Sequence, residues 1–225
     1  MNKYIKVCTI VLLMIFSFYY TEKVALYVQN NTPLKKEIMS YKKSNNINYV
    51  NAIVDGEYII PGINGLEINV DKSYNKMKSI NVFSENYLVY DQVKPEVSTS
   101  DFKYKIINRG NPNKNGVSII INNNNSISSY FDSNNVTYDF IDKTNYCIKS
   151  KVVDCLKSKK RIVEPTLYLT NQNFLKSIDM INKGYIIYID NSVSINYVYF
   201  LIQHIRYNNL HILKLNEHLT EKLKV

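Results

Sequence analysis

Short apolar runs alternate with segments of helical periodicity from residue 117 to the end of the chain. This pattern predicts strands at 117–121, 136–141, 162–169, 185–189 and 210–215. Helices are predicted between them, at 126–133, 143–159, 172–182 and 193–207. Such alternation is typical of an α/β fold with a parallel sheet, either closed as a (β/α) barrel or left open. In both forms we expect the functional edge at the carboxyl ends of the strands.

The first 28 residues have the pattern of an export signal or a membrane anchor. Lys3 and Lys6 lie at the start of an almost wholly apolar run, Ile5 to Tyr20, which is close to the shortest length that spans a bilayer. The run ends in Phe-Ser-Phe-Tyr-Tyr-Thr-Glu-Lys, without the small residues of a signal-peptidase site. We therefore expect a single uncleaved transmembrane helix at 1–28, with its N-terminus in the cytoplasm and the rest of the chain on the extracytoplasmic side of the cell membrane.

Two further parts are predicted between the anchor and residue 117. The polar segment 29–48 carries apolar residues at a weak helical spacing, which indicates a stalk. Residues 49–110 combine strand and helix patterns, which indicates a small α+β unit before the domain at 117–225. Its expected elements are two strands between 50 and 60, a hairpin turn at Asn64-Gly65, a short helix capped by Asp71 or Ser73, and a strand at 87–93.

The composition changes this picture mainly through charge. Of the 225 residues, 45% are apolar and 21% are charged, as in a folded protein, and the formal net charge is +9. That charge favours anionic lipids, wall polymers or nucleic acid as partners. The basic residues are scattered, however, and no zinc-finger spacing or aromatic-glycine RNA motif accompanies them. Nucleic acid is therefore not an expected partner.

Cys147 and Cys155 are the candidates for a disulfide in an oxidising compartment. On one unbroken helix, their spacing would place them about 12 Å apart, beyond the reach of a disulfide. A bond therefore requires the helix to begin after Cys147. The alternative is a pair of partly buried thiols.

Patterns that resemble a known protein family occur in three stretches of the chain: Ile59–Val93, Val117–Asp142 and Tyr185–Leu219. Near the C-terminus, GYIIYIDN is similar to Gly-x-Ile-Ile-Leu-x-His-Asp, and LHILKLNEHL is similar to Gly-Tyr-x-x-x-x-Leu-x-x-Leu. Through these patterns the chain resembles the polysaccharide deacetylases of the NodB type, over a little more than half of its length. The resemblance implies a shortened deacetylase-like domain at 117–225, preceded by a membrane-proximal segment.

The catalytic positions implied by the resemblance are altered. In the family, the first strand ends in Thr-Phe-Asp-Asp-Gly, where one Asp is the base and the next is a metal ligand. Residues Ile120 to Asn124 occupy these positions here, so the base and the ligand fall on Asn122 and Asn123. A carboxamide has no titratable proton near neutral pH and binds divalent metals poorly. The family's His-x-x-x-His segment is deleted after Asp142, and its acid position falls on Asp190, which could act only if burial raised its pKa by several units.

Other groups of reactive residues give weaker candidate sites. The three histidines repeat every seven residues, but neighbours on one helix would lie about 10.5 Å apart, too far to share one metal ion. They are His204, His211 and His218. Four acids near the strand ends are candidates for a facing carboxylate pair: Asp139, Asp142, Asp190 and Glu217. Such a pair would allow glycosidase-like chemistry, although strand-end acids more often cap helices.

Together these features predict a membrane-anchored, extracytoplasmic deacetylase-like protein without catalytic activity, cofactor or metal. The expected partner is cell-wall polysaccharide or an envelope protein. Polar groups at the strand ends can hydrogen-bond sugar hydroxyls, and Tyr168 or Tyr188 can stack on a sugar ring if they face the cleft. The expected ligand-binding residues are Asn122, Asn123, Asn124, Asn171 and Asp190.

Three alternatives stand beside this prediction. The first is an active hydrolase that deacetylates an N-acetylated polysaccharide through an atypical zinc site. The second is a structural subunit of an envelope complex. In the third, the polar strand ends are solvated loops that bind no ligand.

Overall fold

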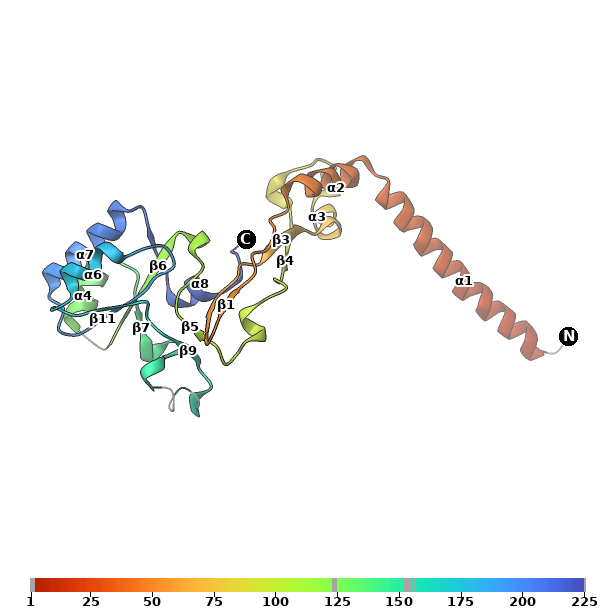
Figure 1. Cartoon of the computed structure of the whole chain (residues 1–225). Coiled ribbons are helices and arrows are strands. Elements are labelled where there is room, and N and C mark those ends of the chain that lie inside the picture. The colour runs from red at the N-terminus through yellow and green to blue at the C-terminus, as the bar shows by residue number, and fades with distance from the viewer. Residues whose placement is uncertain (1–2, 123–124, 152–154, 156, 225) are drawn as a thin grey trace. The chain divides into compact units, whose positions relative to one another are not determined.

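The computed structural model of the whole chain describes residues 3–122, 125–151, 155 and 157–224 (Figure 1). The chain divides into two compact units, the first up to Ile47 and over Leu66–Gln92, and the second over Asn48–Gly65 and Val93–Lys224. This division differs from the predicted stalk at 29–48 and α+β unit at 49–110. The reason is strand pairing, because strands within 53–60 and 106–107 join a sheet with strands from the C-terminal half.

The first unit begins with helix α1 (Lys3–Asn30). Its segment Val7–Ala25 is long and apolar enough to cross a membrane, properties that a signal sequence shares. The apolar side chains of this segment are exposed rather than packed in the unit. An N-terminal apolar helix is therefore present where the sequence predicts an anchor.

The rest of the first unit is a small α+β arrangement of α2 (Pro33–Asn45), β3 (Gly65–Ile68), α3 (Val70–Met77) and β4 (Tyr90–Val93). Strands β3 and β4 pair, and α2 packs against α3. Asn69 caps α3, since its side chain accepts a hydrogen bond from Lys72 N at 2.9 Å. The predicted caps, Asp71 and Ser73, are wrong because both lie inside the helix.

A five-stranded sheet in the second unit has the order β1-β2-β5-β9-β8. The strands are β1 (Ile53–Asp55), β2 (Tyr58–Ile60), β5 (Ile106–Ile107), β8 (Tyr146–Ile148) and β9 (Arg161–Val163). Strands β1 and β2 form an antiparallel hairpin, and the other pairs are parallel. The hairpin turns at Gly56, whose φ of +52° suits glycine, and not at the predicted Asn64-Gly65.

A second sheet of the same unit is built around β6 (Gly116–Ile121), in which every residue is buried. Its strands follow the order β10 (Leu167–Leu169), β11 (Ile186–Ile189), β6 and β12 (His211–Ile212), and β7 (Asp139–Phe140) pairs with the end of β6. All of these pairs are parallel. The predicted α/β class with parallel strands is thus confirmed.

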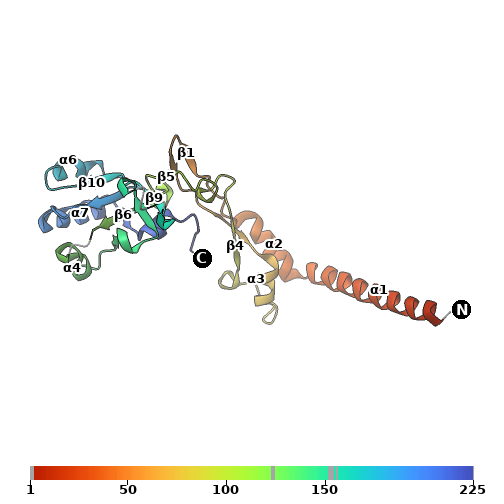
Figure 2. The same cartoon turned by 90° about the horizontal axis from the view of Figure 1, so that it is seen from below.

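Side chains of β6 alternate between two cores, as expected for a strand buried on both faces. Ile119 and Ile121 pack with the helices, and Ile120 packs with residues of the other sheet such as Ile107 and Val163. The helices are α4 (Asn125–Ser133), α6 (Phe174–Ser177) and α7 (Ile195–Tyr207). Both views show them gathered on the side of this unit away from β5 and β9 (Figures 1 and 2).

Several predicted elements are wrong in their extent or type. The predicted helix at 143–159 begins instead as strand β8 and a 3-10 turn at Lys149–Lys151; residues 155, 157 and 158 are helical, and 152–154 and 156 lie outside the described residues. The strand at 162–169 is split into β9 and β10 around Pro165, which cannot donate to a strand ladder. The strand at 210–215 ends at Ile212, and Leu215 begins helix α8 (Leu215–Leu219).

Candidate functional site

A cavity of about 400 Å³ lies near the carboxyl ends of β6, β10 and β11, where the fold predicts the functional edge. We call it the tyrosine pocket. It is lined by Asn122, Ile141, Asp142, Tyr146, Cys147, Ile148, Ser150, Ser158, Lys160, Tyr168 and Tyr188.

Two tyrosines on neighbouring strands form one wall of the pocket. Tyr168 of β10 and Tyr188 of β11 are register partners, with ring centroids 5.4 Å apart and ring planes inclined by 46°. Tyr168 is exposed and Tyr188 is half-buried. Burial raises the pKa of both phenols, so both hydroxyls are neutral near pH 7 and can donate hydrogen bonds. The pair offers ring surface together with polar edges.

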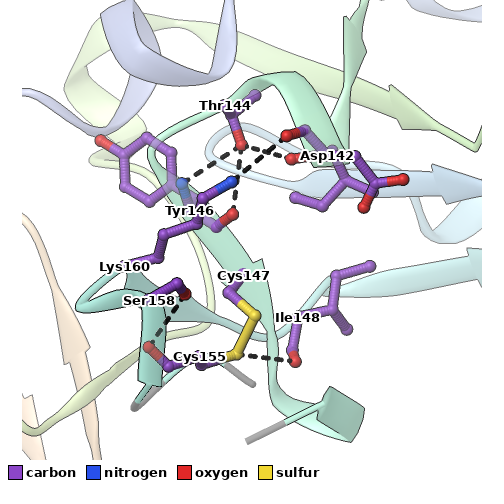
Figure 3. The surroundings of a disulfide bond; sticks show 9 residues. Asp142, Thr144, Tyr146, Cys147, Ile148, Cys155, Ser158 and Lys160 are labelled. Atoms are coloured by element: carbon purple, nitrogen blue, oxygen red, sulfur yellow. Dashed lines mark hydrogen bonds between the residues drawn. A yellow bond between two sulfur atoms is a disulfide. The ribbon is translucent and has the colours of Figure 1, made fainter.

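The disulfide Cys147–Cys155 holds another wall of the pocket (Figure 3). Its two Cα atoms are 5.5 Å apart, because Cys147 lies in β8 and Cys155 in a helical turn after it. The sequence left a disulfide and two free thiols open, and the structure has the disulfide. Thr144 supports the turn before β8, since its hydroxyl donates to Ile141 O at 2.8 Å. Lys160 Nζ donates a hydrogen bond to Asp142 O at 3.2 Å, which links the residue before β9 to the turn before β8.

The strand-end asparagines contribute to the pocket through Asn122. This half-buried residue follows β6 directly and lines the pocket. Asn123 and Asn124 lie outside the described residues. A carboxamide at the family's base position can hydrogen-bond a ligand but cannot take up a proton near neutral pH.

The other predicted ligand-binding residues hydrogen-bond to nearby backbone and do not line the tyrosine pocket. Asp190 Oδ1 accepts from Ser192 N at 2.9 Å, and hydrogen bonds to Ser192 lower the pKa of Asp190. A general acid would need the opposite change. Asn171 is exposed, and its Oδ1 accepts from Ser194 N at 3.3 Å at the start of α7.

The residues near the strand ends do not fit the metal of the deacetylase family. In the part of the chain that the structure describes, no group of three His, Cys, Asp or Glu side chains could hold a metal ion. The histidines lie on separate elements: His204 in α7, His211 in β12 and His218 in α8. No catalytic step through a metal follows from this donor set.

Three of the four acids considered for a carboxylate pair accept hydrogen bonds or form ion pairs outside the tyrosine pocket. Asp142 lines the tyrosine pocket. Asp139 Oδ2 accepts from Leu215 N at 2.6 Å, at the start of α8. Glu217 lies in α8 and pairs with Lys224 at 2.7 Å. With Asp190 holding Ser192, the acids do not form a facing pair in the pocket.

A second cavity, of about 560 Å³, was not foreseen from the sequence. We call it the basic cavity. It is lined by Asn64, Lys94, Ser98, Thr99, Ser100, Lys103, Ile107, Asn145, Tyr146, Arg161, Asn216, Leu219, Thr220, Glu221 and Lys222. These residues are far apart in the sequence, so only the fold brings them together.

The chain shares sequence with known proteins over a short stretch and shares its fold with solved structures over most of its length. No family model matches the chain. A stretch of 91 residues is 40% identical to the uncharacterized protein YlxY of Bacillus subtilis. It represents 40% of this chain and 28% of YlxY, so the chain matches less than a third of that protein.

Solved structures of BA3943, described as a CE4 family pseudoenzyme, resemble the fold. The wild-type protein from Bacillus anthracis aligns with a TM-score of 0.54 at 16% identity, over 86% of this chain and 97% of that one. A mutant described as having restored enzymatic activity aligns with a TM-score of 0.53 at 16% identity, over 86% of this chain and 100% of that one. The likeness shows that this chain has a deacetylase-like α/β fold.

Proposed function

We propose that this chain is a membrane-anchored, extracytoplasmic, deacetylase-like protein that binds cell-wall glycan in the tyrosine pocket without catalysing its deacetylation. The observation that carries the proposal is the pair Tyr168 and Tyr188 on the wall of a cavity at the expected functional edge. Aromatic faces beside a few polar groups are the usual means of holding a sugar ring.

The absence of catalysis is supported by the chemistry of the strand ends. Deacetylation needs a base for water, an electrophile for the amide carbonyl and an acid for the leaving amine. Asn122 offers a carboxamide in place of a base, and Asp190 has a lowered pKa where an acid is needed. Both residues retain hydrogen-bonding groups that suit binding.

The membrane location is supported by α1. Its apolar segment has the length of a spanning helix, and its side chains have no core to pack against within the first unit. A disulfide in the second unit agrees with exposure to an oxidising compartment.

The test is glycan binding by the full chain, purified in a neutral detergent. Binding to chitooligosaccharides and to insoluble peptidoglycan would be measured by calorimetry and by sedimentation. We expect Tyr168→Ala to weaken binding by about tenfold or more, because it removes the exposed ring of the pair. Tyr168→Phe retains the ring and should bind nearly as well. Tyr207→Ala is the matched control, since Tyr207 is 85% exposed on α7 and does not line the pocket.

Two results would contradict the proposal in different ways. Release of acetate from the same glycans together with stoichiometric zinc would identify an active hydrolase. Failure to bind any wall glycan, with co-purification of another membrane protein, would identify a structural subunit of an envelope complex.

A further inference from the structure

The basic cavity contains a guanidinium group that lacks acceptors. Arg161, the first residue of β9, lines the cavity, and its Nε and Nη2 atoms make no hydrogen bond within the described part of the chain. Burial lowers the pKa of Arg161, but an arginine remains charged at physiological pH because its ordinary pKa lies far above that pH. Glu221 attracts this charge through space, but two buried nitrogens still lack hydrogen-bond acceptors, so the arrangement favours an anion beside Arg161.

Two lysines add positive charge to the same cavity. Lys103 and Lys222 line it with exposed side chains, and neither forms an ion pair with another described residue. Lys94 also lines the cavity, but its Nζ lies 2.7 Å from Asp101 Oδ1 and is already paired. Lys103 and Lys222 therefore lie around the cavity without a described ion-pair partner, beside Arg161 with its two unsatisfied nitrogens.

Glu221, the acid on the cavity wall, is engaged by other donors. One carboxylate oxygen accepts hydrogen bonds from Gly62 N at 3.1 Å and Thr99 N at 2.8 Å. The other accepts from the Ser98 hydroxyl. Because these groups already hold the carboxylate in place, Glu221 does not supply the acceptors that the Arg161 guanidinium lacks.

Neutral donors complete the lining. Ser100, Asn64, Asn145 and Asn216 contribute hydroxyl and amide groups to the wall. A phosphate group, with several oxygens and up to two negative charges, matches one arginine, two lysines and such donors better than a single carboxylate does. A cavity of about 560 Å³ can also hold an organic group attached to the phosphate.

We propose that the basic cavity binds a phosphate group carried by a larger molecule, with Arg161 as the main anchor and Lys103 and Lys222 as supporting charges. The site is separate from the glycan proposal. Tyr146 lines both cavities, but the phosphate site needs no residue at the carboxyl ends of β6, β10 and β11.

The primary test uses inorganic phosphate as the probe and the full chain in neutral detergent. Calorimetric titration is carried out at constant ionic strength, with chloride replaced by phosphate. We expect saturable binding at one site, weakened by about tenfold or more in Arg161→Gln. Arg206→Gln, on an exposed residue of α7, removes the same charge away from the cavity and should bind like the wild type. Absence of saturable binding, or equal losses in both variants, would overturn the proposal.

Thermal unfolding separates a binding role from a structural one. If Arg161 serves the ligand, Arg161→Gln keeps the unfolding temperature of the phosphate-free chain or raises it, and loses the rise that phosphate causes. A lower unfolding temperature with an undiminished phosphate effect would assign Arg161 a structural role instead. Should Arg161→Gln fail to fold, the double variant Lys103→Gln and Lys222→Gln changes only exposed side chains and should weaken phosphate binding by about tenfold.

Two further probes identify the source of the phosphate. A soluble glycerol-phosphate oligomer that binds more tightly than inorganic phosphate would indicate a wall polymer. Binding to phosphatidylglycerol vesicles by the wild type but not by Arg161→Gln would indicate a lipid headgroup. If both probes bind Arg161→Gln as well as the wild type, the cavity is not a phosphate site.

Discussion

Ser118 and His218 are paired in the interior of the second unit, with 2.6 Å between Ser118 Oγ and His218 Nδ1, although they are 100 residues apart in the sequence. Both side chains are fully buried, and burial lowers the pKa of His218 to about 3. The nearby charge of Lys114 acts in the same direction. The pair joins α8 to the central strand β6, and burial keeps the imidazole neutral.

The first prediction concerns stability at acidic pH. An unfolded histidine takes up a proton near pH 6.5, whereas His218 stays neutral in the folded chain until about pH 3. The contribution of neutral His218 to the free energy of unfolding is therefore complete above pH 6.5. It is lost as the pH falls toward 3, by up to about 1.4 kcal/mol per pH unit. Urea unfolding between pH 6.5 and 5 measures this slope before most carboxylates titrate. His218→Gln should flatten the slope, and His211→Gln, on an exposed side chain, should leave it unchanged.

The second prediction concerns two closely packed glycines, Gly110 beside His218 and Gly184 beside Gly110. A Cβ on Gly110 would overlap with His218 Nε2, and a Cβ on Gly184, where φ is +85°, would lie 2.5 Å from Gly110 O. Gly110→Ala, through overpacking, and Gly184→Ala, through overpacking and backbone strain, should each lower the free energy of unfolding by about 2 to 3 kcal/mol. Chemical denaturation measures the loss.

Gly56→Ala is the control for this pair. Its φ is also positive, at +52°, but no atom lies within 4 Å of the added Cβ, so the loss should be about 1 kcal/mol. Equal losses in Gly184→Ala and Gly56→Ala would show that backbone conformation alone, and not the close contact with Gly110 O, sets the cost at Gly184.

The third prediction concerns the disulfide. Cys147 and Cys155 close a loop with a sequence separation of 8, so replacing both by Ser should destabilise the larger unit by about 2 to 3 kcal/mol. Thermal unfolding with and without a reducing agent gives the same comparison in the wild type. Cys8→Ser, at the free cysteine of α1, should change neither measurement. An unfolding temperature that does not respond to reduction would contradict the prediction.

The fourth prediction concerns restoring carboxylates at the strand end. The double variant Asn122→Asp and Asn123→Asp should bind no stoichiometric zinc and release no acetate from chitooligosaccharides. The described residues supply no group of histidines and acids that could complete a metal site. Elemental analysis after dialysis and an acetate assay check both points. Zinc at one equivalent in the variant would show that other residues complete the site.

The sequence predicted the fold best where one period dominates. The wholly buried run of β6 and the helical spacing of α7 each appear close to their predicted bounds, because burial on both faces or on one helix face leaves a clear pattern. Local sequence patterns predicted the wrong element where contacts between distant residues determine the secondary structure. Residues 143–159 have helical spacing, but Tyr146–Ile148 pairs with β9 as strand β8 instead.

The two cavities differed in how far the sequence could predict them. Tyr168 and Tyr188 were foreseen as stacking residues because strand ends meet at one sheet edge. The basic cavity was missed because Arg161 meets Lys103 and Lys222 only through the pairing of β5 with β9 and the path of the C-terminal segment. Pro165 was the available signal that the strand beginning near Arg161 ends early.

The disulfide in the wall of the tyrosine pocket makes the finished pocket dependent on where the chain resides. In a reducing cytoplasm, Cys147 and Cys155 stay as thiols, and Cys155 has no covalent link to β8. After export to an oxidising compartment, the disulfide can form and hold this wall of the pocket. Under the proposed function, a newly made chain would gain its full affinity for glycan only in the compartment where the glycan is found, without any separate regulator.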